Sequence, residues 1–298
     1  GLGDVYKRQV STPTFDPENI PSDIETNDAY KGAYYDRTLS VTYAPGSTFK
    51  VFTTASAIDH FTDWSTRTYS CMGKEIINGN TITCMSEHGE LDIREGLAVS
   101  CNILFADLAI DLGSENLTET CEEMGFNRSW DLDGIPVQAS NLDLNGATDD
   151  QLGWAGIGQY TTEVTPYHMM LVMDAIANGG SAVTPHIIQS ITDANGTVSQ
   201  PDTSQITLLD SNTAAQLNEL LRNDVVSDYG DGNFPSGMQV CGKTGTAEVG
   251  GDQEDTAWFV GYCQNPDTPY AFVAVVEEGG FGRSTAMPII VSLLQQLA

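Results

Sequence analysis

The chain has 298 residues, 40% of them hydrophobic, which is enough to bury one large core or two modest ones. Lys and Arg number 12 against 41 Asp and Glu, and the resulting net charge of −29 would repel nucleic acid and anionic lipid headgroups, so we expect no nucleic-acid partner. The longest apolar runs, at residues 270–276 and 289–294, are shorter than the roughly 18 to 20 residues of a membrane span, and residues 1–9 lack the pattern of a signal peptide.

The first element that the sequence predicts is a helix over residues 49–61. Residues 1–35 contain three prolines and little periodicity, so we expect an extended lead-in that needs a partner to pack on. A Pro-Gly-Ser turn at residues 45–47 then precedes apolar residues at helical spacing, namely Val51, Phe52, Ala55 and Ile58. Ser47 should therefore lie at a helix N-terminus, where unpaired N–H groups and the positive end of the helix dipole stabilise developing negative charge.

A turn-rich stretch between Cys71 and Cys84 predicts a hairpin. Because these two cysteines bracket the hairpin, they can form a disulfide in an oxidising compartment, with two free thiols as the equal alternative. The six cysteines are scattered, without a Cys-x-x-Cys pair or a matching His pair, which argues against a zinc site. We expect most of the others to be small buried hydrophobic residues.

Helices dominate the middle of the chain and strands dominate its last third. Helices are predicted over residues 103–112 and 167–177, the second one ended by Asn-Gly-Gly at 178–180. Runs of β-branched and aromatic residues at 239–249, 256–263 and 270–277 predict consecutive antiparallel strands, and residues 288–297 predict a closing helix. The expected fold is of the α/β (α+β) class, with a mainly antiparallel central sheet flanked by helices, an all-helical subdomain, and an active-site cleft between them.

Three short motifs follow one another along the chain, and the first is Ser47-Thr48-Phe49-Lys50. The spacing puts Ser47 and Lys50 on one helical face, one turn apart, so the Lys50 amine can reach the Ser47 hydroxyl. Serine is a poor nucleophile until a base takes its proton, and lysine becomes that base if burial or a nearby positive charge, such as Lys243, lowers its pKa. For this tetrapeptide alone, the alternative is an N-cap serine beside a solvated surface lysine.

The second motif, Ser100-Cys101-Asn102, precedes an apolar helix. The Ser100 hydroxyl can pass a proton to a leaving amine and the Asn102 amide can hold a substrate amide, although Ser and Asn are also common helix caps. The third motif, Lys243-Thr244-Gly245-Thr246, lies in a predicted strand. Gly245 would let a ligand backbone approach the strand while the other three side chains contact a carboxylate, and an ordinary edge strand is the alternative.

In this order, the three motifs resemble those of penicillin-binding proteins and class A β-lactamases, with Cys101 in place of an aspartate in the second motif. Further matches lie at residues 43–46, 88–89, 166, 177–180 and 258–262. Most of the chain is therefore similar to the transpeptidase domain of a class B penicillin-binding protein. This resemblance implies a β-lactamase/transpeptidase-like fold, a peptidoglycan D,D-transpeptidase, and covalent inhibition by β-lactams.

The resemblance also implies a role for each motif residue. Ser47 would be acylated by the penultimate D-Ala of a peptidoglycan stem peptide, with Lys50 as general base, Ser100 as proton relay and Asn102 binding the peptide amide. The third motif would hold the terminal carboxylate of the D-Ala-D-Ala terminus through Lys243, Thr244, Gly245 and Thr246. Backbone N–H groups of Ser47 and Thr246 would form the oxyanion hole. We expect no cofactor and no metal ion.

The resemblance further implies a setting for the protein. The family acts at the extracytoplasmic face of the bacterial cell membrane, held by an N-terminal helix, and the full-length protein would have a membrane glycosyltransferase as partner. We interpret residues 1–298 as the transpeptidase domain, truncated at its N-terminus, with the pedestal domain and the anchor absent. Residues 1–9 do not match the family and are interpreted as non-native. Tyr160 also departs from the family pattern, which has Gly-Gln-Gly where this chain has Gly158-Gln159-Tyr160.

A D,D-carboxypeptidase, a β-lactamase or a β-lactam sensor would use the same acylation site, and a β-lactamase would also need a base for deacylation, for which Glu163 is a weak candidate. A catalytically silent wall-binding module is a further alternative, although it would not need Lys50. Residues 141–146 resemble the start of a calcium-binding loop, but Leu152 stands where such a loop needs an acid, so we expect a solvated acidic loop.

Overall fold

The computed structural model describes residues 9–201, 203–251 and 253–298. Residues 1–8, most of the segment interpreted as non-native, lie outside the described residues. The described helices are α1 (Arg37–Ser40), α2 (Lys50–His60), α3 (Ile93–Ala98), α4 (Asn102–Glu123), α5 (Asp149–Gly156), α6 (Pro166–Ala177), α7 (Ser211–Asp224) and α8 (Ala286–Leu297). Shorter helical turns are η1 (Asp28–Tyr30), η2 (Gly46–Phe49), η3 (Trp64–Thr66), the π-helical turn η4 (Val225–Tyr229) and η5 (Asp231–Asn233).

The described strands form one three-stranded sheet and five two-stranded ones. They are β1 (Thr68–Cys71), β2 (Lys74–Ile77), β3 (Asn80–Thr83), β4 (Gly89–Asp92), β5 (Trp130–Leu132), β6 (Ile135–Val137), β7 (Ser181–Val183), β8 (Ile191–Thr192), β9 (Val198–Ser199), β10 (Gln205–Thr207), β11 (Val240–Ala247), β12 (Thr256–Cys263) and β13 (Ala271–Val276). All of the named pairings are antiparallel.

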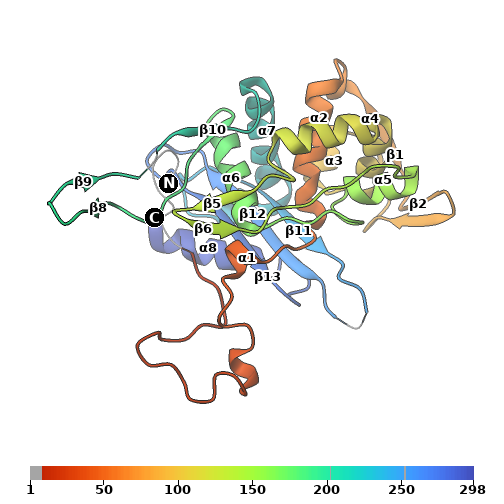
Figure 1. Ribbon diagram of the computed structural model, residues 1–298. Coiled ribbons are helices and arrows are strands. Elements are labelled where there is room, and N and C mark those ends of the chain that lie inside the picture. Colours follow the sequence, from red (N-terminus) through yellow and green to blue (C-terminus); the bar gives the residue numbers. More distant parts are fainter. Residues whose placement is uncertain (1–8, 202, 252) are drawn as a thin grey trace.

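The centre of the fold is the antiparallel sheet of β11, β12 and β13, in that order. All of β12 is buried because helices cover both faces of the sheet (Figure 1). Trp258 and Val260 point into one hydrophobic cluster together with α6, whereas Phe259 points into a second cluster together with α8, as alternation along a strand requires. Helix α7 packs along β11, the first strand of this sheet.

The helical part of the molecule lies at one end of the sheet (Figure 1). In it, α4 packs between α2 and α5, and α3 packs against α7. The helix predicted over residues 103–112 is interrupted at Gly113, whose backbone is not helical (φ 76°). Helical geometry resumes after this residue and continues to Glu123. The predicted three strands, the helix α6 and the closing helix α8 are all confirmed, with shifts of one or two residues at their ends.

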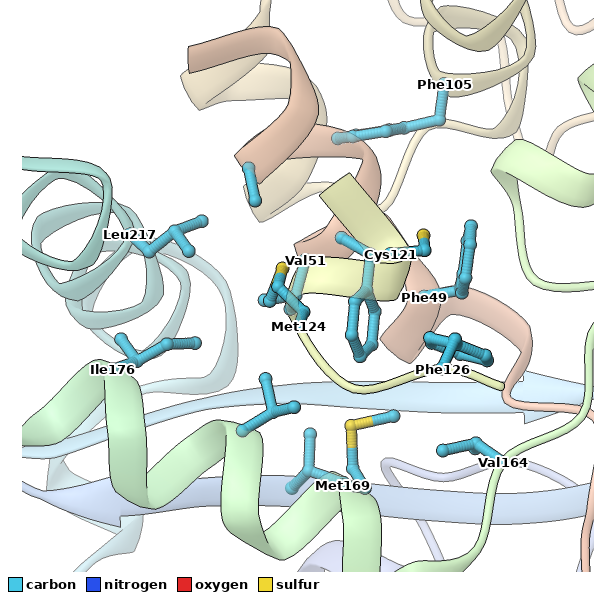
Figure 2. Close-up of a cluster of buried hydrophobic side chains, with 14 of the residues drawn as sticks. Phe49, Val51, Phe105, Cys121, Met124, Phe126, Val164, Met169, Ile176 and Leu217 are labelled. Carbon is cyan, nitrogen blue, oxygen red and sulfur yellow. The ribbon is translucent and has the colours of Figure 1, made fainter. Parts of the chain in front are cut away.

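Beneath the first motif lies a dense aromatic and aliphatic cluster, which Figure 2 shows between α2, α6 and α7. Phe49 is fully buried there, with its ring centroid 5.3 Å from that of Phe52 and 5.8 Å from that of Phe126. Since Phe49 is two residues from Ser47, the core holds the start of α2 in a fixed place. This packing positions the first motif against the sheet.

The region around the first two cysteines agrees with the predicted hairpin, which is formed by β2 and β3. Cys71 and Cys84 flank it, but both are free thiols, as are the other four cysteines. The lead-in from residue 9 to residue 36 is mostly irregular, as expected, apart from turns and η1. Within the described part of the chain, every helix is too short or too polar to cross a membrane.

Candidate active site

The first motif lies on a short helical turn pressed against the edge of the sheet. Ser47 is the second residue of η2, which leads directly into α2, so its predicted place at a helix N-terminus is confirmed. A Cβ added to Gly46 would lie 2.3 Å from the carbonyl oxygen of Thr246, which places the turn directly on β11. The Trp258 indole donates a hydrogen bond to the carbonyl oxygen of Ala44 (3.0 Å) and holds the preceding segment on β12.

Lys50 is fully buried, and its amine lies among four oxygen atoms. Nζ donates to the carbonyl oxygen of Ser100 (2.7 Å) and to Oδ1 of Asn102 (2.8 Å), and it lies 3.1 Å from Oγ of Ser47 and 3.2 Å from Oγ of Ser100. The carbonyl and amide oxygens can only accept, so they take two N–H groups of the amine. A neutral Lys50 would then have its lone pair for the remaining direction, toward the two serine hydroxyls.

The second motif forms a tight turn between α3 and α4. A capping box of Asp92 and Glu95 fixes the start of α3, and Ser100 has a left-handed backbone conformation (φ 55°) that turns the chain into α4. The Ser100 hydroxyl consequently lies between two amines, 3.2 Å from Nζ of Lys50 and 3.0 Å from Nζ of Lys243. The side-chain amide of Asn102 donates to the carbonyl oxygen of Thr83 (2.9 Å).

The third motif lies in β11, and the structure brings it to the other two. Lys243 is fully buried and spans the distance from the strand to Ser100. The Tyr229 hydroxyl lies 3.4 Å from Nζ of Lys243, 3.1 Å from the backbone nitrogen of Thr244 and 3.2 Å from its hydroxyl oxygen. All three sequence motifs therefore converge on the Ser47 hydroxyl and its neighbours.

Comparison with known proteins identifies the family. Residues 7–295 match the family described as penicillin-binding protein transpeptidase domain. The chain belongs to this family. It is 28% identical to the peptidoglycan D,D-transpeptidase PbpA of Mycolicibacterium smegmatis over 295 residues, 91% of this chain and 59% of the relative. It is also 28% identical to penicillin-binding protein 3 of Bacillus subtilis, covering 91% of this chain and 43% of that protein.

Solved structures of this family agree with the fold. Penicillin-binding protein A of M. tuberculosis, determined as a ceftriaxone acyl-enzyme complex, superposes with a TM-score of 0.85 at 25% identity, covering 96% of this chain and 69% of that one. The D,D-transpeptidase domain of a peptidoglycan glycosyltransferase from Eggerthella lenta gives 0.84 at 27% identity, covering 96% and 74%. The predicted fold class is thus confirmed. The chain spans 59% and 60% of the mycobacterial PbpA sequences that it matches.

In this transpeptidase domain, contact with the turn that carries Ser47 explains why residue 245 is a glycine. An added Cβ would meet Cγ2 of Thr48 at 2.8 Å and the carbonyl oxygen of Pro45 at 2.9 Å. The missing side chain therefore makes room for the turn that carries Ser47. Gly158 does the same from another side, since its Cβ would lie 2.1 Å from the carbonyl oxygen of Gly46.

Burial and neighbouring charge set the ionisation of the site. Burial, with the positive charge of Lys243 as the second cause, holds the pKa of Lys50 well below its usual range. Asp224, at the end of α7, is fully buried, and its carboxylate oxygens have no hydrogen-bond partner among the described residues. Burial raises the pKa of Asp224 to about 7, while the charge of Lys243 acts in the opposite direction.

Tyr229 and Asp224 lie at the site but belong to none of the three sequence motifs. Asp224 ends α7 and Tyr229 ends η4, and both elements pack against β11. Their place beside the third motif depends on this packing, so local sequence gives no signal for them. Glu163, the weak candidate for a deacylating base, instead accepts a hydrogen bond from the Thr42 hydroxyl (2.7 Å) and is exposed. Among the described residues, no carboxylate is hydrogen-bonded to Ser47 or Lys50.

Tyr160, the departure from the family pattern, has a left-handed backbone conformation (φ 65°) and a side chain that is 46% exposed. Glycine adopts this conformation at no cost, so the tyrosine introduces backbone strain here. Two hollows of about 370 and 430 Å³ lie elsewhere on the surface, beside α2 and α7 and beside α3 and α7. Neither is lined by Ser47.

Proposed function

We propose that this chain is the catalytic domain of a peptidoglycan D,D-transpeptidase that forms an acyl-enzyme on Ser47. The observation that carries the proposal is the position of the Lys50 amine, 3.1 Å from the Ser47 hydroxyl and fixed by two carbonyl-type acceptors. A buried amine whose pKa is lowered can take the proton of that hydroxyl. A catalytically silent wall-binding module would have no use for this arrangement.

In the first half-reaction, Oγ of Ser47 attacks the carbonyl carbon of the penultimate D-Ala while its proton passes to Nζ of Lys50. Backbone N–H groups of Ser47 and Thr246 bind the oxyanion that forms. Ser100, which lies within 3.2 Å of both amines, then relays a proton to the nitrogen of the leaving D-Ala as the peptide bond breaks. In the second half-reaction, an acceptor amine attacks the ester and the same groups return the proton.

Substrate binding is proposed to use the remaining polar groups. Lys243, together with the hydroxyls of Thr244 and Thr246, binds the terminal carboxylate, and Tyr229 orients the first two. Asn102 already uses one N–H for Thr83 and one lone pair for Lys50, so one N–H and one lone pair remain for the peptide amide. Gly245 contributes by seating the Ser47 turn.

The setting of the reaction follows from the family. Because the stem peptides of peptidoglycan lie outside the cytoplasm, we propose that the domain works at the extracytoplasmic face of the membrane, held there by an N-terminal helix. A membrane glycosyltransferase would supply the glycan strands that it cross-links. β-Lactams, which form acyl-enzymes in solved relatives such as penicillin-binding protein A of M. tuberculosis, should inhibit it covalently.

Covalent labelling tests the proposal. A fluorescent penicillin should label the protein in a denaturing gel, and Ser47→Ala should abolish the label, with Ser40→Ala, a serine on α1, as a matched control that keeps it. Labelling that persists on Ser47→Ala would place the nucleophile elsewhere. Mass spectrometry of the products from a stem-peptide thioester, with and without an amine acceptor, then separates a transpeptidase from a carboxypeptidase, which would release only the hydrolysed peptide.

A further inference from the structure

Four side chains from three segments of the chain converge at the second motif. Cys71 ends β1, Cys84 follows β3, His88 lies in the loop before β4, and Cys101 is the N-cap residue of α4. Their ligand atoms, three Sγ and one imidazole nitrogen, all lie within 4.8 Å of one another. We call these four residues the Cys3His cluster.

The distances within the Cys3His cluster fit a tetrahedral metal ion. Nδ1 of His88 lies 3.5 Å from Sγ of Cys71 and 3.5 Å from Sγ of Cys84, and the sulfurs of Cys84 and Cys101 are 3.9 Å apart. Zinc held by bonds of about 2.3 Å to sulfur and about 2.0 Å to nitrogen places tetrahedral ligand atoms about 3.5 to 3.8 Å apart. A small inward movement of the more widely spaced pairs would complete the site.

The same distances argue against a disulfide, since bonded sulfurs are about 2.05 Å apart and these are free thiols. Cys71 and Cys101 are fully buried, while Cys84 and His88 are partly exposed, so one side is closed and the other offers a path for an ion. Two N–H groups already point at the sulfurs: those of Asn102 to Cys84 (3.3 Å) and of Leu104 to Cys101 (3.5 Å). Such N–H donors stabilise thiolates and are the usual surroundings of metal-bound cysteine.

We propose that Cys71, Cys84, His88 and Cys101 bind a zinc ion. Three thiolates and one imidazole are a common ligand set for structural zinc, and four protein ligands leave no open position for chemistry. Zinc ligands often come as Cys-x-x-Cys or His pairs in short motifs, and this sequence has none of them. Here the ligands come from three places in the chain, the end of β1, the β3–β4 connection that carries both Cys84 and His88, and the start of α4. The β1–β4 and β2–β3 pairings bring the first two together.

The zinc ion would act on the active site through Cys101, which stands between Ser100 and Asn102. A metal bond to Cys101 would tie that turn to the β1–β4 region. In addition, Sγ of Cys84 accepts a hydrogen bond from the backbone N–H of Asn102. The ion would therefore position the Ser100 and Asn102 groups that contact Lys50. This consequence rests on the proposed function, whereas metal binding itself does not.

Metal binding can be measured on the full chain, purified under reducing conditions. After incubation with Zn²⁺ and removal of the excess, elemental analysis should find about one zinc per chain. Substitution with Co²⁺ should give an intense thiolate-to-cobalt charge-transfer band and the strong visible bands of tetrahedral cobalt. Cys84→Ala and His88→Ala should weaken binding by tenfold or more, whereas Cys263→Ala, which removes a thiol from β12, should bind as the wild type does.

The zinc proposal is overturned if the reduced, folded wild type takes up no cobalt, if Cys84→Ala binds it equally well, or if peptide mapping finds a disulfide among the three cysteines. A positioning role predicts that zinc removal slows labelling by fluorescent penicillin about tenfold or more, with recovery on adding zinc back. The cobalt spectrum does not depend on labelling. A protein that binds cobalt but never reacts with penicillin would therefore refute the proposed function and leave the metal site standing.

Discussion

Substituting Gly245 by alanine tests how the Ser47 turn is seated on β11. The new Cβ would lie 2.8 Å from Cγ2 of Thr48 and 2.9 Å from the carbonyl oxygen of Pro45. Both distances are shorter than the non-bonded contacts that Cβ atoms make in proteins. Ordinary contact begins near 3.4 Å, so the turn must move by about half an ångström. The movement would displace the Ser47 hydroxyl from Nζ of Lys50, because Ser47 lies on the turn whereas Lys50 lies at the buried start of α2.

The size of the effect follows from this geometry. Inserting a methyl group into a packed site costs about 1 to 3 kcal/mol of folding free energy. A misplacement of 1 Å at a reacting group costs about 100-fold in rate, so half of that displacement should lower the acylation rate about tenfold. If glycine instead served ligand approach, alanine would lower the rate while leaving the folding free energy unchanged.

The assay is the second-order rate constant of labelling by fluorescent penicillin, together with urea denaturation. Gly232→Ala is the matched control, because an added Cβ there meets no atom within 4 Å, and it should match the wild type in both measurements. Thr48→Ser removes Cγ2 but keeps the hydroxyl that donates to Pro45 (2.8 Å), so the Gly245→Ala/Thr48→Ser double variant should recover part of the lost rate. A Gly245→Ala protein with wild-type rate and stability would show that the added methyl group does not displace the turn that carries Ser47.

Three further predictions concern charge and hydrogen bonding. Lys243→Gln removes a positive charge that, after burial, is the second cause of the lowered pKa of Lys50, so the acid limb of the acylation pH profile should move to higher pH; an unmoved limb contradicts this. Tyr229→Phe removes the hydroxyl that contacts Thr244 and should slow acylation about fivefold, equivalent to about 1 kcal/mol, in the same kinetic assay. Burial lowers the pKa of His168 to about 4, so the unfolded state binds a proton more readily and stability falls as the pH drops from 6.5 toward 4. Between pH 7 and pH 5, urea denaturation should show the wild type losing about 2 kcal/mol more than His168→Gln, and equal losses would contradict the assigned cause.

The sequence was sufficient for the parts of the fold that local patterns encode. Runs of β-branched and aromatic residues predicted β11, β12 and β13, and the turn before Val51 predicted the start of α2. The spacing of Ser47 and Lys50 predicted their contact, since one helical turn fixes it. These predictions succeeded because each depends on residues close together in the chain.

What the sequence did not predict depends on packing between distant segments. The contact of Gly245 with a turn nearly 200 residues earlier in the chain could not be read from the sequence around it. Tyr229 reaches the third motif only through the packing of α7 on β11. The Cys3His cluster is the clearest case, because Cys71 and Cys101 are distant in sequence from the segment that carries Cys84 and His88. The pairing of four short strands and the start of α4 bring them together.

The central claim is that Ser47 becomes an ester, and intact-protein mass spectrometry with penicillin G tests it most directly. The protein should gain the mass of one intact penicillin, located by peptide mapping on Ser47 and still present hours after the free drug is removed. Two results would contradict it. An unchanged mass, or an adduct on another residue, would remove Ser47 as the nucleophile, and an adduct lost within seconds would indicate a β-lactamase.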